Sequence, residues 1–194
     1  NFTSNPLYKV KIKKLNDDGV CKPVDAYFSE LLKNDIGDKR AMSEFCEKWG
    51  NTDGYIDILK MKFFDNFDEC KTYAIELIDK EPLSERILSL SSLRGYLKKY
   101  VFGEHLQTRP DLMGVSQNKL YRGAGEVNVY GNIRLAKENE FEHFGFEASD
   151  KDFYEHLDLA YFGLGAPDTK FRTIFPDRME IFMQSVEKKY KFIR

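Results

Sequence analysis

The stretch from Leu120 to Tyr130 (LYRGAGEVNVY) sets two short apolar runs on either side of a pair of glycines. Leu120-Tyr121-Arg122 precedes Gly123 and Gly125, and Val127-Asn128-Val129-Tyr130 follows them. Aromatic and β-branched residues between turn-forming residues are typical of strands. We therefore predict a strand on each side, with the glycines marking a bulge or a close backbone approach. Glycine and asparagine interrupt the neighbouring segments too, so residues 107–147 are predicted to be strand-rich.

Outward from this stretch, towards the N-terminus, residues 20–103 are predicted to be helix-rich. Apolar residues recur there at intervals of three or four, as they do on one face of a helix. The predicted helices cover residues 24–32, 41–49, 67–78 and 84–101, whereas residues 55–64 fit either a helix or a strand. The segment Leu7–Leu15 differs, because apolar and lysine residues alternate along it. That period of two predicts a strand, ended by the turn residues 16–19.

Towards the C-terminus, residues 150–190 are predicted to form two helices. Ser149 followed by Asp152 has the spacing of a capping box and begins a helix that Gly163 ends. A last helix carries apolar residues from Met179 to Tyr190. No repeat and no long linker divides the chain, so we predict a single domain over residues 1–194. The predicted fold class is α+β, with a helical N-terminal half packed on a small mixed sheet formed mainly by the C-terminal half.

Composition excludes several classes of protein. The chain has 194 residues with a net charge of −2 at pH 7, which argues against a strongly basic nucleic-acid binder. No apolar run reaches the ~20 residues that a membrane helix needs, and no signal-peptide pattern is present. The three cysteines are widely spaced and odd in number, which does not suit a disulfide framework or a structural zinc site. A reducing cytoplasmic location is therefore expected.

Two carboxylates around the opening stretch invite a metal-site hypothesis. Asp111 follows Pro110 at a predicted strand start, and Glu126 lies 15 positions later on the next predicted strand (126 − 111 = 15). On adjacent strands of a hairpin, two such acids can share a divalent cation such as Mg²⁺ or Mn²⁺. That ion can bind a phosphodiester oxygen and lower the pKa of an attacking water.

The motif Pro110-Asp111, a spacer and then Glu126-x-Asn128 resembles that of the PD-(D/E)XK nuclease family, over residues 95–137. The resemblance implies a metal-dependent nuclease that acts on or binds DNA or RNA, as in a phage or defence system. It also implies Asp111 and Glu126 as cation ligands and Glu104 as an accessory acid. Asn128 stands at the family's lysine position, so Lys137 or Lys119 would supply the catalytic cation.

Two further enzymatic interpretations are weaker. Each histidine follows a glutamate (Glu104-His105, Glu142-His143, Glu155-His156), but neighbouring residues point apart on strands and helices, which disfavours a shared metal. Leu120-Tyr121-Arg122-Gly123 is similar to a strand of arginine-class ADP-ribosyltransferases. The Ser-Thr-Ser strand of those enzymes is missing, which disfavours that class.

A partner surface is predicted on the first strand. Lys9, Lys11 and Lys13 share one strand face and form a ridge that can follow DNA or RNA phosphates. The alternative interpretation is a solvent face that protects an edge strand. A separate hypothesis for the whole chain is a non-catalytic protein-interaction module, such as an inhibitor or immunity-type factor, which binds a protein partner through exposed aromatic and charged side chains.

Overall fold

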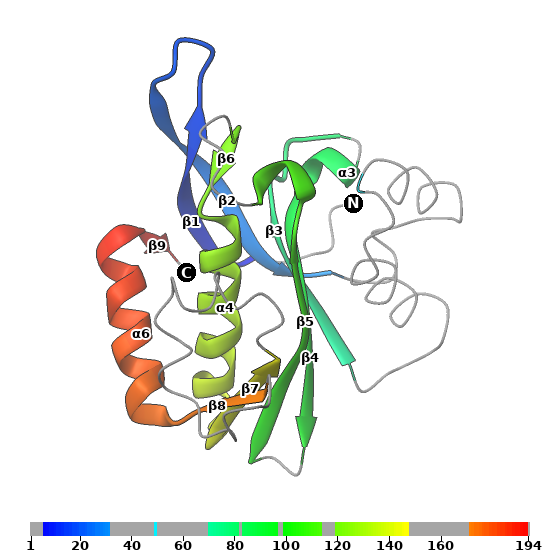
Figure 1. Cartoon of the computed structure of the whole chain (residues 1–194), viewed down its shortest axis with the longest axis vertical. Helices are drawn as coiled ribbons and strands as arrows, with labels where there is room; N and C mark the ends of the chain where they lie inside the picture. The colour runs from blue at the N-terminus through cyan, green and yellow to red at the C-terminus, as the bar shows by residue number, and fades with distance from the viewer. Residues whose placement is uncertain are drawn as a thin grey trace.

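A strongly curved sheet dominates the computed structural model, which describes residues 6–31, 49, 70–81, 83–96, 99–113, 119–147 and 171–193 (Figure 1). Its strands are β1 (Pro6–Leu15), β2 (Cys21–Glu30), β3 (Cys70–Glu76), β4 (Ile87–Tyr96), β5 (Tyr100–Thr108), β6 (Tyr121–Arg122), β7 (His143–Glu147), β8 (Phe171–Ile174) and β9 (Phe192–Ile193). The helices of the described ranges are α3 (Leu83–Arg86), the 3-10 turn η2 (Pro110–Leu112), α4 (Ala124–Glu138) and α6 (Pro176–Lys189).

The strand order is β6-β1-β2-β3-β4-β5-β7-β8, with β9 also paired to β1. Neighbours from β1 to β5 are antiparallel, and so are β7 and β8. The pair β5–β7 is parallel, because α4 carries the chain back across the sheet between these two strands. Their pairing runs from Tyr100 opposite His143 to Gly103 opposite Phe146, although β5 continues to Thr108. The strand β5 therefore extends beyond the end of β7.

The first strand behaves as its sequence predicts. Tyr8, Val10 and Ile12 are at most 2% exposed and face the core, while the intervening lysines face away from it. The turn after β1 is also confirmed, with Gly19 at a φ of 80°. Burying one apolar face of a strand while solvating the other requires alternation, which is why the pattern is legible in this segment.

Helix α4 lies across the core face of the sheet, and α6 packs beside it (Figure 1). Of α6, Met179, Phe182, Met183 and Val186 are buried. Two polar contacts tie the helices together: Tyr130 Oη donates to Glu187 Oε1 at 2.5 Å, and Lys137 pairs with Glu180. The predicted last helix is thus confirmed.

The predicted fold class is wrong for the N-terminal half. Residues 21–30, 70–76 and 87–96 are strands of the sheet, where helices over 24–32, 67–78 and 84–101 were expected. The physical reason is visible in β4, where every residue from Ile87 to Leu93 is buried. A strand covered on both faces loses the alternation of period two, and its apolar residues can then fall at helical intervals by chance.

The opposite error occurs between Leu120 and Tyr130, where a helix replaces a predicted strand. Residues 127–130, expected as a strand, belong to α4. Ten of the helix's fifteen residues are buried, so it shows no clean apolar stripe. Tertiary burial here overrides the weak helix propensity of its glycine, asparagine and valine residues.

Other predicted elements cannot be compared. The predicted helix over 41–49 (apart from Trp49), the segment 55–64 and the helix that Ser149 begins lie outside the described residues. Among the described helices, none combines the length and the hydrophobicity that spanning a bilayer demands.

Candidate functional site

The N-terminus of α4 is formed by a glycine turn. Gly123 follows β6 directly, caps the helix, and has φ of 99° and ψ of −6°, a left-handed conformation that favours glycine. A Cβ atom at this position would also lie 2.6 Å from the Tyr190 hydroxyl. The backbone therefore approaches Tyr190 as closely as a glycine permits, which confirms the predicted close approach but places it at a helix start instead of a bulge.

This turn leaves several backbone donors available. The Val127 N–H donates to the Gly123 carbonyl at 3.0 Å and closes the first turn of α4. The N–H groups of Ala124, Gly125 and Glu126 precede that bond and have no acceptor within a helix of this geometry. They also stand at the positive end of the helix dipole. Together these groups make the start of α4 attractive to an anion.

The start of α4 has a defined position relative to the parallel strands of the sheet. Because α4 returns the chain from the carboxyl end of β5 to the beginning of the parallel strand β7, its N-terminus lies on the side of the carboxyl end of β5 (Figure 1). Crevices outside the carboxyl ends of parallel strands are where open sheets commonly bind ligands. Glu104 lies in β5 one position after Gly103, the last residue that pairs with β7.

The only acid in the first turn of α4 is neutralised by the end of α6. Glu126 accepts a hydrogen bond from Lys189 Nζ at 2.8 Å and another from Tyr190 Oη at 3.0 Å. Burial and the neighbouring Glu126 carboxylate raise the pKa of Tyr190, so its hydroxyl stays protonated and donates. Glu126 is thus tied to these two residues, and its charge is offset by Lys189.

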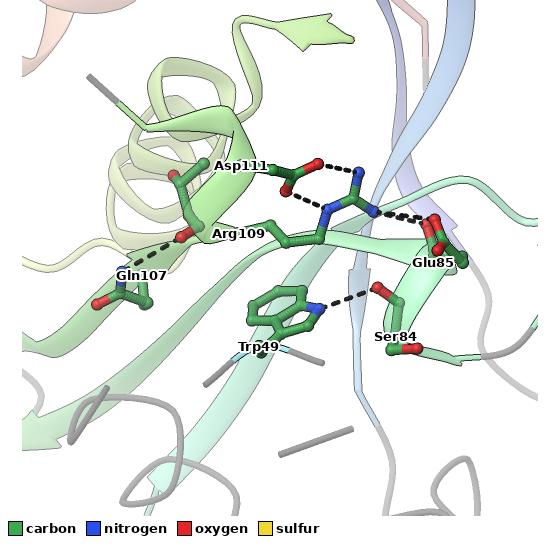
Figure 2. A network of polar contacts seen from close by, with 7 residues as sticks. Trp49, Ser84, Glu85, Gln107, Arg109 and Asp111 are labelled. Carbon is green, nitrogen blue, oxygen red and sulfur yellow. Dashed lines mark hydrogen bonds and ion pairs between the residues drawn. The ribbon is translucent and has the colours of Figure 1, made fainter. Parts of the chain in front are cut away.

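A buried arginine organises the chain where β5 ends (Figure 2). The Arg109 side chain is 5% exposed; its Nε and Nη2 donate to the two carboxylate oxygens of Asp111 at 2.7 and 3.0 Å. Nη1 donates to the Glu85 carbonyl at 3.1 Å. Figure 2 also shows the Trp49 indole, which donates to the Ser84 carbonyl at 2.9 Å beside this cluster. Arg109 therefore joins η2 to α3 and fixes the exit of β5.

A cleft of about 740 Å³ opens near the strand that leads into α4. It is lined by the β1–β2 turn, the β3–α3 turn and β6, through Lys14, Leu15, Asn16, Asp17, Asp18, Lys22, Lys80, Glu81, Glu85, Leu120 and Tyr121. Tyr121 is 5% exposed, and burial raises the pKa of its hydroxyl. Lysines and carboxylates line the cleft together, so it presents a polar surface of mixed charge.

The predicted metal site is wrong. Asp111 forms its ion pair with Arg109, and Glu126, on a helix instead of a strand, contacts Lys189 and Tyr190, so the two acids bind different partners. Within the described ranges, no three side chains of histidine, cysteine, aspartate or glutamate come together in a way that could hold a metal ion. The expectation of Mg²⁺ or Mn²⁺ as cofactor has no support in this geometry.

The residues proposed to supply the catalytic cation also serve other purposes. Lys137 pairs with Glu180 of α6. Burial lowers the pKa of Lys119, and the positive charge of Arg122 lowers it further.

Asn128, at the lysine position of the nuclease motif, is fully buried against β4. Its Oδ1 accepts a hydrogen bond from Ser91 and its Nδ2 donates one to Ser89, both at 2.9 Å. These contacts hold α4 on the sheet.

The histidines do not converge in the described structure. His143 lies in β7 with its ring edge-on to Phe175 at 4.9 Å, and His105 lies in β5. His156 falls outside the described residues. Arg122, singled out for the ADP-ribosyltransferase interpretation, is an exposed residue of β6 opposite Lys13.

Sequence reasoning missed the glycine turn, Arg109 and the pair Lys189–Tyr190. A signal for the turn was present, since Gly123-Ala124-Gly125 follows a short strand-like run. A glycine pair between a strand and a helix is a common anion-binding arrangement. From the sequence, a bulge or close packing at these glycines is preferred to a phosphate cradle, with residues 127–130 as a strand; the structure makes those residues part of α4. Lys189 and Tyr190 are 63 and 64 positions from Glu126, and no local pattern links them.

Comparison with known proteins identifies the fold. No family model and no curated protein matches the sequence. The crystal structure of AtaTR bound with AcCoA aligns with a TM-score of 0.55 and 12% identity, over 80% of this chain and 96% of that one. The structure of the AtaT–AtaR complex bound to DNA aligns with a TM-score of 0.53 and 12% identity, over 79% of this chain and 97% of that one.

These matches overturn the nuclease resemblance, and they do not favour the non-catalytic interaction module either. The aligned proteins have the fold of the GNAT acetyltransferases. The chain therefore has a GNAT fold and not that of a PD-(D/E)XK nuclease.

Proposed function

We propose that this protein is an acyltransferase that uses a coenzyme A thioester, such as acetyl-CoA, as acyl donor. The observation that carries the proposal is the start of α4, a glycine turn whose first backbone N–H groups have no acceptor within the helix, on the side of the carboxyl end of β5. The AtaTR structure, which shares the fold, contains AcCoA. A CoA thioester supplies an activated acyl group together with a phosphorylated handle for binding.

The residues present suit the phosphate groups of such a substrate. The N–H groups of Ala124, Gly125 and Glu126 would bind phosphate oxygens at the positive end of α4. A free carboxylate in this turn would repel them, but Lys189 offsets the charge of Glu126.

One residue is a candidate for handling the acceptor. Tyr121 lines the cleft two positions before Gly123 and would orient the acceptor with its protonated hydroxyl.

Calorimetric titration of the purified protein tests the donor. Acetyl-CoA should bind, and pantetheine, which lacks the phosphates, should bind at least about tenfold more weakly, because charge-assisted hydrogen bonds contribute about 1.5–3 kcal/mol each. Equal binding of the two compounds, or no binding of acetyl-CoA at millimolar concentration, would refute the proposal.

A second experiment addresses catalysis. Thiol release from acetyl-CoA is measured with a panel of primary amines for the wild type, Tyr121→Phe and the exposed control Glu142→Gln. Tyr121→Phe should lower the rate by about 2–10-fold, as expected for loss of one hydrogen bond to the acceptor. Acetyl-CoA binding should persist. An unchanged rate in Tyr121→Phe would remove Tyr121 from the mechanism.

The strand β1 is the candidate surface for a macromolecular partner. The AtaT–AtaR structure holds a second protein and DNA, which supports a protein or nucleic-acid partner for a chain of this fold. Lys9, Lys11 and Lys13 share the face of β1 opposite the core, in agreement with the alternation of the sequence. We assign the docking of an anionic partner to this face.

A further inference from the structure

The lysine face of β1 is extended by two cations from distant parts of the sequence. Arg122 of β6 lies directly opposite Lys13, and directly opposite residues of antiparallel strands project to the same face. The Lys11 N–H donates to the Lys191 carbonyl at 3.4 Å, which places Lys191 beside Lys11 just before β9. Both Arg122 and Lys191 are exposed.

The five cations form a compact surface, which we call the basic face: Lys9, Lys11, Lys13, Arg122 and Lys191. The strands β6 and β9 pair with the same edge of β1, one after the other, so the added cations run parallel to the lysines (Figure 1). Successive lysines on one face of β1 are about 6.8 Å apart, and neighbouring strands about 4.8 Å.

Such an arrangement carries an energetic cost. Like charges directly opposite each other destabilise a sheet, and here Lys13 faces Arg122. The whole chain has a net charge of −2, so the basic face differs in sign from the chain as a whole. Asp25 of β2 forms ion pairs with two lysines of the basic face. Lys11 Nζ lies 2.7 Å from Asp25 Oδ1, and Lys9 Nζ lies 3.7 Å from Asp25 Oδ2.

We infer that the basic face binds the phosphate backbone of a single-stranded nucleic acid. Cations repeating along β1 match a flexible polyanion. Tyr27, half-buried opposite Lys9, adds an aromatic ring to the same face, where a base can stack.

Asp25 has a particular role in this arrangement. Its carboxylate occupies Lys9 and Lys11, and the hydrogen bond from Lys11 lowers the pKa of Asp25, so it stays ionised near neutral pH. A phosphate must therefore compete with Asp25 for these lysines. Asp25→Asn should strengthen binding of nucleic acid, whereas neutralising cations of the face should weaken it.

The inference names the partner that the proposed function leaves open, and its test is independent of acyl transfer. Fluorescence anisotropy is measured with a labelled 20-nucleotide oligo(U) between 50 and 200 mM salt. For single strands the slope of log K against log salt is about −0.7 per phosphate contact, so five contacts predict about −3.5. Lys13→Gln combined with Arg122→Gln should make the slope shallower by about 1.4, and Asp25→Asn should tighten binding.

The control is Lys71→Gln, an exposed lysine of β3 that should leave affinity unchanged. No binding at 50 mM salt, or a double variant indistinguishable from this control, would overturn the inference. Equal affinity for poly-glutamate would also overturn it, and would indicate an acidic protein partner. Acetyl-CoA titration of the same variants separates the two proposals: loss of oligo(U) binding with intact acetyl-CoA binding leaves the proposed function standing, and the converse leaves the basic face standing.

Discussion

Replacing Gly131 by alanine should destabilise the folded protein, whereas the same substitution in a helix normally stabilises it. In an unhindered helix interior, Gly→Ala stabilises a protein by about 1 kcal/mol. At Gly131 in α4, however, the new Cβ would lie 2.5 Å from two carbons of the Phe28 ring. Carbon atoms pack best at about 3.5–4.0 Å, so the overlap is on the order of 1 Å.

Phe28 cannot easily yield to the added methyl group. It is 1% exposed, and its ring stacks on Tyr8 at 5.9 Å and on Tyr73 at 5.3 Å. Overpacking of a core costs about 1–3 kcal/mol. Because the overlap is large and the ring is held on both sides, we expect an overpacking cost of about 2–3 kcal/mol. The gain in helix propensity offsets about 1 kcal/mol of it, which leaves a net destabilisation of about 1–2 kcal/mol.

Urea denaturation and calorimetry of Gly131→Ala provide the measurement. A chain of this length loses about 2–4 °C in Tm per kcal/mol, so Tm should fall by about 2–8 °C. Adding Phe28→Leu should make the double variant more stable than the sum of the single effects predicts, because the two positions share one contact. A Gly131→Ala protein as stable as the wild type, or more stable, would refute the placement of α4 flat on the sheet.

Three further predictions follow from the site. Asn128→Lys, which completes the nuclease motif, should confer no nuclease activity and should destabilise the fold by several kcal/mol by burying an unpaired ammonium, measured by urea denaturation and plasmid cleavage. Asp111→Asn should cost about 1–3 kcal/mol, because the buried Arg109 loses its bidentate partner; a change below about 0.5 kcal/mol would contradict that role. Burial and Glu126 raise the pKa of Tyr190 in the folded protein, so the unfolded chain loses the phenol proton at a lower pH than the folded protein does. Stability should therefore be unaffected by this group below pH ~10 and fall above it, and Tyr190→Phe should reduce that alkaline loss in urea midpoints recorded at pH 8 and 11.

Local patterns predicted those elements that have one buried face. The alternation of Tyr8, Val10 and Ile12 with lysines specified β1, and the spacing of Met179 and Val186 indicated α6, because each segment packs on one side and meets water on the other. The same reasoning placed the lysines of β1 on one face, and the structure agrees.

Local patterns failed where burial is nearly complete. In β4 and α4, apolar and small polar residues fill both faces, so neither a period of two nor a period of 3.6 stands out. The buried network of Asn128 with Ser89 and Ser91 explains why polar residues occupy the interior of α4, but it links positions 39 and 37 apart, beyond any sequence window.

The sequence by itself indicated residues that could carry chemistry, namely the acids and the lysines of the first strand. Only the tertiary structure decided which of them meet. It assigned Asp111 to Arg109, and it brought the end of α6 to Glu126 and Arg122 and Lys191 to the edge of β1. The physical reason is that strand and helix propensities act over a few residues, whereas these contacts join segments whose proximity arises from burial of the common core.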